Sequence, residues 1–129
     1  MNKILVEVSI GELFDKISIL EIKKEKIKNQ DKLKFINDEY DVLKTELDKN
    51  IKLDEKLINL FKSLKEINSK LWDIENEKRL CEKNSDFSDK FIKASRDIHF
   101  LNDNRGKIKL EINDHTGSKI KEIKEYTSY

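Results

Sequence analysis

Residues that interrupt or cross-link a chain are scarce in this sequence. There is no proline, and the 129 residues include only three glycines and one cysteine. With so few helix breakers, long uninterrupted helices are permitted and a turn-rich β architecture is disfavoured. The single cysteine, Cys81, excludes an intrachain disulfide, so a cytoplasmic protein is the simplest expectation.

Long apolar runs and blocks of like charge are missing as well. No stretch approaches the roughly 20 apolar residues that cross a membrane, and no signal-peptide core is apparent. Acidic and basic residues nearly cancel, which leaves a formal charge of +1. Because neither sign forms a block, we expect neither nucleic acid nor a membrane surface as a partner.

The sequence does contain a helical pattern. Charged residues make up 41% and apolar residues 36% of the chain, which suits helices with one apolar stripe and a charged outer face. Apolar periodicity predicts four helices in one domain, 1–129. Their expected ranges are about 10–29, 31–49, 54–83 and 87–114, with a short β-like arm at 3–8 and a tail at 115–129.

Local signals mark the ends of these helices. Glu12 follows Ser9 at the capping-box spacing, so Ser9 is predicted to cap the first helix. Asp31 is predicted to cap the second, and Gly117 is expected just past the end of the fourth. Gly106 lies inside a helical pattern, where glycine costs about 1 kcal/mol, so another element is expected to pack closely there.

Short connections make sequential helices antiparallel neighbours, so the sequence predicts an all-α protein built as an antiparallel four-helix bundle. The two later helices are longer than the two earlier ones, which leaves the tip of their hairpin uncovered. Apolar residues at such a tip are typical of an interface. We therefore expect a homodimer formed through the tip residues Ile74, Leu80, Phe87 and Phe91.

Motifs for metals, cofactors and catalysis are not apparent. Cys81, His99 and His115 lack the spacing of zinc ligands. No glycine-rich phosphate loop or nucleophile elbow is present. The sequence therefore predicts no metal, no cofactor and no catalytic residue.

Arginine is the informative residue type, because three arginines stand against 24 lysines. A planar guanidinium suits carboxylates and phosphates, and Arg105 falls with Asn102 on the apolar stripe of the fourth helix. Counting helix turns places Glu21 and Tyr40 level with Arg105, so Glu21 is the predicted partner of its charge.

Two interpretations of these polar residues stay open. One is a buried polar layer that fixes how the helices pair. The other is a pocket between helices for a small anionic ligand. The candidate ligand-binding residues for such a pocket are Arg105, Asn102, Glu21, Lys16, Tyr40 and His99.

Longer stretches of the chain are similar to a known family. The segment VEVSIGELFDKISILEIKKEKI, which begins at Val6, and the later segments LWDIENEKR, CEKNSDFSDKF and HFLNDNRGKIKLEIN carry the likeness. They resemble a domain-of-unknown-function family of short bacterial and phage proteins. The resemblance covers nearly the whole chain and implies no activity. Its pattern falls on Ser9, Gly11, Glu12, Asp15, Lys16, Glu21, Trp72, Glu75, Asn102, Asp103 and Arg105.

The function is therefore unknown at this stage, and two hypotheses follow. The favoured one is a non-catalytic helical module for interaction or oligomerisation. The alternative is a protein, or an enzyme, that binds a small anionic ligand in a polar pocket between helices. The many polar positions in the family pattern favour the pocket somewhat, because packing alone does not require them.

Overall fold

The computed structural model describes residues 3–129 and contains four α-helices. They are α1 (Ile10–Lys26), α2 (Gln30–Asn50), α3 (Glu55–Lys83) and α4 (Asp89–Thr116). No strand occurs among residues 3–129, so the predicted all-α class is confirmed. In the same part of the chain, no helix is both long and apolar enough to span a membrane.

Side-chain caps begin the first two helices. Ser9 Oγ accepts a hydrogen bond from Glu12 N at 3.0 Å, which is the predicted cap of α1. The prediction of Asp31 as the second cap is wrong. Asn29 takes that position, and its Oδ1 accepts from Lys32 N at 3.0 Å. Asparagine caps as well as aspartate does, so the helix begins at the earlier of the two residues.

The start of α3 and the end of α4 are also capped. Asp54 caps α3 by accepting a hydrogen bond from Leu57 N at 2.8 Å. α4 ends at Thr116 and is capped by Gly117, whose φ of 68° is left-handed and therefore suits glycine. Gly117 N donates to Asn113 O, so the helix terminates as expected from the sequence.

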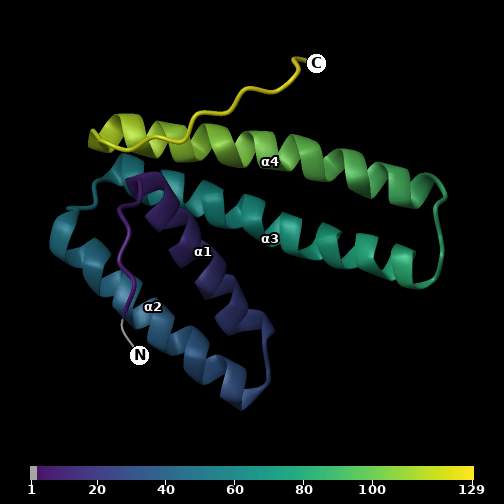
Figure 1. Cartoon of the computed structure of the whole chain (residues 1–129), viewed down its shortest axis with the longest axis horizontal. Coiled ribbons are helices and arrows are strands. Elements are labelled where there is room, and N and C mark those ends of the chain that lie inside the picture. Colours follow the sequence, from purple (N-terminus) through teal and green to yellow (C-terminus); the bar gives the residue numbers. More distant parts are fainter. Residues whose placement is uncertain (1–2) are drawn as a thin grey trace.

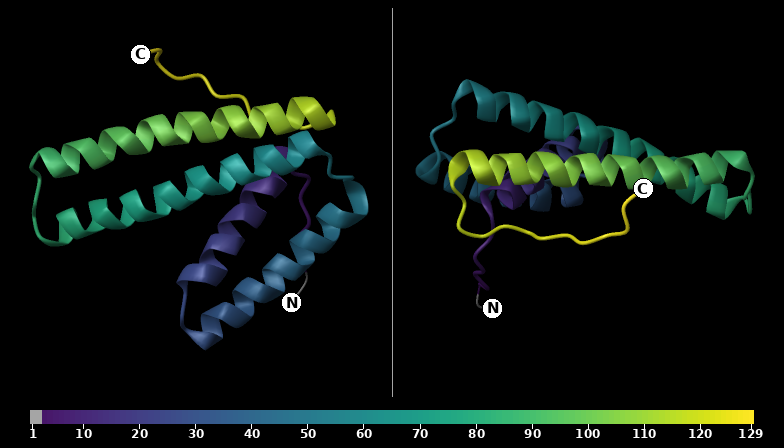
Figure 2. Two further views of the ribbon diagram at one scale, coloured as in Figure 1. Left: turned by 180° about the vertical axis from the view of Figure 1, so that it is seen from behind. Right: turned by 90° about the horizontal axis from the view of Figure 1, so that it is seen from above.

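The four helices form two antiparallel hairpins that cross obliquely (Figure 1). α1 is central, because it packs against each of the other three helices, whereas the α2 backbone approaches only α1. The view from behind shows the same crossing and the free outer end of the α3–α4 hairpin (Figure 2). The chain therefore differs from the predicted bundle with four helices aligned side by side. The α2 backbone approaches neither α3 nor α4, so contacts along α2 do not align the short hairpin with the long one.

The apolar core lies where the hairpins cross. Its buried side chains come from all four helices: Phe14, Ile17, Leu47, Leu57, Leu64 and Ile112. The ring of Phe14 packs edge-on against Phe61, with 6.0 Å between centroids. This core sits at the inner end of the long hairpin, where α3 begins and α4 ends.

α1 is buried on two faces, unlike the helices around it. Phe14 and Ile17 belong to the apolar core. Gly11, Asp15 and Ser18 lie at helical spacing on the other face and are also buried. A helix with two buried faces is positioned by neighbours on both sides.

Gly11 sets the distance between α1 and α4. A Cβ at this position would overlap the backbone oxygen of Lys109 and lie 3.0 Å from Asn113 Oδ1. At Gly106 the nearest atom to a Cβ would be Lys124 Nζ, at 3.9 Å. The expectation of close packing at Gly106 is therefore wrong, and the close approach occurs at Gly11.

The N-terminal arm and the tail leave α1 and α4 as extended segments (Figures 1 and 2). Ile10 N donates to Ser118 Oγ at 3.2 Å, which ties the start of α1 to the start of the tail. Farther on, the tail runs along α4. The Tyr129 hydroxyl donates to an Asp103 carboxylate, and the Tyr129 ring packs edge-on against Phe100.

The arm is extended but does not pair as a strand within residues 3–129. Its apolar side chains face water, with Ile4 89%, Leu5 90% and Val6 74% exposed. The predicted β-like character of the arm is not confirmed, because residues 3–9 form no regular secondary structure.

Alanine substitutions at the two helical glycines are expected to act in opposite directions. Gly11→Ala should lower the free energy of unfolding by about 1–3 kcal/mol, because the new Cβ forces α1 and α4 apart. Gly106→Ala should raise it by about 0.5–1 kcal/mol, since the site has room and alanine favours helix. Urea unfolding measures both changes, and a stabilising Gly11→Ala would contradict the close contact.

Candidate functional site

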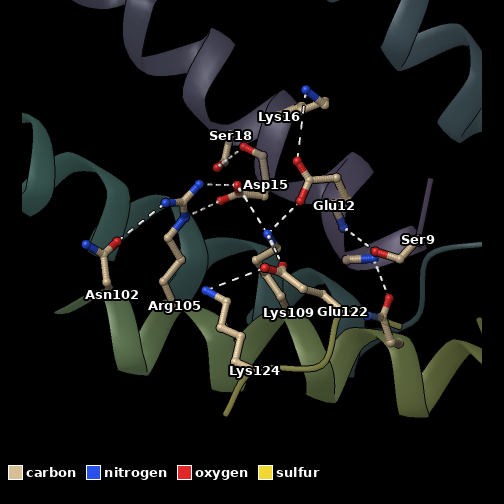
Figure 3. A network of polar contacts seen from close by, with 12 residues as sticks. Ser9, Glu12, Asp15, Lys16, Ser18, Asn102, Arg105, Lys109, Glu122 and Lys124 are labelled. Carbon is tan, nitrogen blue, oxygen red and sulfur yellow. Dashed lines mark hydrogen bonds and ion pairs between the residues drawn. The ribbon is translucent and has the colours of Figure 1, made fainter. Parts of the chain in front are cut away.

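A buried ion pair joins α1 to α4. The Asp15 side chain on α1 is only 1% exposed, and the Arg105 side chain on α4 is 30% exposed. Arg105 Nε donates to Asp15 Oδ1 at 2.9 Å, and Nη2 donates to Oδ2 (Figure 3). Two parallel charge-assisted hydrogen bonds fix both the distance and the orientation of the two groups.

α3 completes the surroundings of this carboxylate. Asn68 Nδ2 donates to Asp15 Oδ1 at 2.9 Å and to Ser18 Oγ at 2.8 Å. Ser18 Oγ in turn donates to the backbone oxygen of Asp15 at 2.8 Å. Every buried side-chain nitrogen and oxygen in residues 3–129 has a partner, so this polar cluster meets the condition for burial without a large penalty.

A second cation lies one turn along α4 from Arg105. Lys109 Nζ lies 2.6 Å from Glu12 Oε2, 3.8 Å from Asp15 Oδ2 and 3.5 Å from Glu122 Oε2 (Figure 3). Its side chain is only 11% exposed. Glu122 belongs to the tail, so the network extends from α1 through α4 to the last segment of the chain.

The start of α1 is anchored by the same neighbours. The N–H groups of a first helical turn have no partner within the helix. Here Ile10 N donates to Ser118 Oγ and Gly11 N donates to Asn113 Oδ1 at 2.7 Å. Glu12 N is bound by Ser9, so the N-terminus of α1 is capped by its own cap residue and by α4 and the tail.

The charges of the network set its protonation. Burial alone would raise the pKa of Asp15, but hydrogen bonds from Arg105 and Asn68 and the nearby charges outweigh it and lower that pKa. Burial disfavours the charged form of Lys109, yet Glu12 and Asp15 together raise its pKa. Asp15 and Lys109 are therefore both ionised at neutral pH.

The structure brings four of the six predicted site residues together, as two separate pairs. Arg105 Nη1 donates to Asn102 Oδ1 at 3.5 Å, a long hydrogen bond. The predicted pairing of Arg105 with Glu21 is wrong, because the hairpins cross and turn the Asp15 face of α1 toward α4. Glu21 lies on another face of α1, where it accepts from the Tyr40 hydroxyl at 3.2 Å and from Lys65 at 3.1 Å.

The remaining two candidates lie elsewhere. Lys16 is 51% exposed and contacts Glu12 at 3.9 Å. His99 is exposed on α4 and lines a hollow beneath the tail, beside Tyr126 and Tyr129. The six candidates thus lie as two hydrogen-bonded pairs and two further residues, and they do not line one pocket.

Sequence reasoning overlooked part of the network. Asp15 was noted only as one position of the family pattern, and Asn68 and Lys109 were not among the candidate residues. The available signal was the spacing of Gly11, Asp15 and Ser18, which places small and polar residues on one face of an apolar helix. Such a stripe indicates a second buried face, here the one that meets α3 and α4.

These features define an all-helical protein in which a network of paired polar side chains joins α1 to α3 and α4. The chain belongs to the family of unknown function DUF6165, which matches residues 4–129. No curated protein and no solved structure is significantly similar to the chain.

We predict that Arg105→Ala lowers the free energy of unfolding by about 3 kcal/mol, because it leaves the buried Asp15 carboxylate without its main partner. Arg96→Ala, at an exposed position of the same helix, should change it by less than about 0.5 kcal/mol. Chemical denaturation of the two variants measures the difference. Equal, small effects would contradict a structural role for the ion pair.

Acid should remove the contribution of Asp15. Its pKa is lowered in the folded state, so the stabilisation is present above the unfolded-state value of about 3.9 and is lost as pH falls through the folded value. The destabilisation caused by Asp15→Asn should therefore be full at neutral pH and shrink below about pH 4. A difference between wild type and variant that stays constant down to acid unfolding would contradict this assignment.

Proposed function

We propose that this protein is a non-catalytic helical interaction module that self-associates through the outer end of the α3–α4 hairpin. The observation that carries the proposal is the lack of cover over this outer end. α1 and α2 reach only the inner part of the hairpin (Figures 1 and 2). Between Leu71 and the tip of the hairpin, and on the part of α4 that faces this segment, the only buried apolar residues of the described chain are Cys81 and Ala94.

The uncovered end carries an apolar patch, the tip patch, made of three of the predicted tip residues, Leu80, Phe87 and Phe91, together with Ile92. The fourth predicted residue, Ile74, is half-buried on α3. Leu80 is 58%, Phe87 56% and Ile92 51% exposed. Phe87 and Phe91 pack edge to face, with 5.4 Å between centroids. Their mutual contact keeps the rings in place while leaving apolar surface exposed to water, which favours burial against a partner.

A second copy of the chain suits this patch. Two helices bury little apolar surface, whereas two hairpins that overlap at their tips can pack as an antiparallel four-helix bundle. A twofold contact places the same patch on both sides. Acidic and basic residues alternate around the tip, as in Glu82-Lys83 and Asp89-Lys90, so identical surfaces meet without net repulsion.

The polar network supports a structural and not a catalytic role for the inner end. Its acids and bases are paired with one another, and none of Asp15, Arg105 and Lys109 is left without a partner. Catalytic acids and bases need access to a reacting group. The polar network thus fixes the inner end of the α3–α4 hairpin to α1, and the outer end remains available to bind a second copy of the chain.

Light scattering of the full chain should give about twice the monomer mass of 15.3 kDa at micromolar concentration. Phe87→Lys should convert this dimer to a monomer, because the lysine places a charge within the contact. Phe35→Lys is the matched control, since Phe35 is 76% exposed on α2, away from the tip, and should leave the dimer intact.

A third variant separates the tip from the other exposed apolar segment. Leu5 in the N-terminal arm is 90% exposed, and Leu5→Lys should not change the mass. A wild-type protein that stays monomeric would overturn the proposal. So would a dimer that survives Phe87→Lys and dissociates in Leu5→Lys, because the arm would then be the interface.

A further inference from the structure

A cleft of about 420 Å³ opens beside the polar network, where the two hairpins diverge. Its lining comes from α1, α3 and α4. Ile19, Ile22 and Leu71 give it an apolar part, and arginine and asparagine side chains give it a polar part. An apolar hollow with a few convergent polar groups is the usual form of a small-molecule site.

Arg79 supplies the cleft with a cation that the protein itself does not use. It is exposed on α3, and within residues 3–129 it forms no ion pair and no side-chain hydrogen bond. Glu75, one turn earlier on α3, lines the same cleft without pairing with it. In a chain with 24 lysines, a guanidinium at this position offers planar, two-pronged recognition of an oxyanion.

Arg105 contributes a preorganised edge to the same cleft. Its Nε and Nη2 are held by Asp15, and its Nη1 has only the long 3.5 Å contact to Asn102. A guanidinium has more N–H donors than these partners use. Because Asp15 fixes the plane from behind, the unused donors are oriented before any ligand arrives, which reduces the entropy lost on binding.

Trp72 provides a flat apolar surface within the cleft. It is half-buried on α3, and Asn76 lies one turn farther along the same helix in the lining. An indole ring suits stacking against another flat ring, while an amide can donate to and accept from polar substituents. The combination favours a flat molecule over a compact inorganic ion.

We propose that this cleft binds a small flat organic carboxylate, with its oxyanion at Arg79 and its ring against Trp72. The charge of the lining favours a single negative charge. Asp15 neutralises Arg105, and Glu75 opposes ligands that carry more than one charge. Binding does not rest on self-association through the tip patch, since none of the four tip-patch residues lines the cleft.

Benzoate is the probe that tests this site, and Trp72 is the reporter. Trp72 is the only tryptophan of the chain, so intrinsic tryptophan fluorescence monitors the cleft alone. Benzoate should produce a saturable change at millimolar concentration. Benzamide has the same shape without charge and acetate has the charge without a ring, and each should bind at least about tenfold more weakly.

Two arginine variants locate the oxyanion. Arg79→Gln should weaken benzoate binding about tenfold, the loss expected for a charge-assisted hydrogen bond, while the melting temperature stays at the wild-type value. Arg96→Gln is the matched control, because Arg96 is exposed on α4 and does not line the cleft; it should bind benzoate as wild type does.

Three results would overturn the proposal. The first is the absence of a saturable response to benzoate in the folded wild-type protein. The second is equal binding of benzamide and benzoate, which would leave only apolar contact. The third is an equal loss in Arg79→Gln and Arg96→Gln, because the effect would then reflect overall charge and not this cleft.

Discussion

The ionised side chain of Asp15 constrains how α1, α3 and α4 pack, because almost no water reaches it. A buried carboxylate is tolerated only when donors replace its hydration. Here the donors come from Arg105 on α4 and Asn68 on α3. A slide or rotation of α1 would separate the carboxylate from both, so the pairing allows one register. Gly11 belongs to the same constraint, since only a residue without Cβ lets α1 approach α4 so closely.

The crossing of the hairpins follows from this anchoring. α1 has one face in the apolar core and another against α3 and α4, and α2 is attached mainly through α1. The short hairpin is therefore oriented by the polar face of α1 and not by contact along the length of the long hairpin. This leaves the cleft beside Arg105 and the uncovered tip, so the contact that orders the inner end of the hairpin also leaves its outer end without cover.

Local features could be predicted from the sequence, whereas the pairing of distant groups could not. The four helices and the Ser9 cap depend on residues only a few positions apart, and periodicity and capping rules describe them well. The partner of Arg105 depends on how two hairpins cross. Counting turns in an aligned bundle predicted Glu21, yet the oblique packing turns Asp15, six residues earlier on α1, toward Arg105. The uncovered tip of the long hairpin could be predicted, because it follows from the helix lengths alone.

Arg105 and Arg79 are the same type of residue, but their different surroundings give them different roles. The charge of Arg105 is neutralised by Asp15, so this side chain orients groups more than it attracts them. Arg79 keeps its charge available at the edge of the cleft, so long-range attraction of an anion falls to it. Because Arg79 is exposed and makes no contact that the fold requires, binding can change there without loss of the helical arrangement. In the proposed site, stability and recognition would thus be carried by different guanidinium groups that line one cleft.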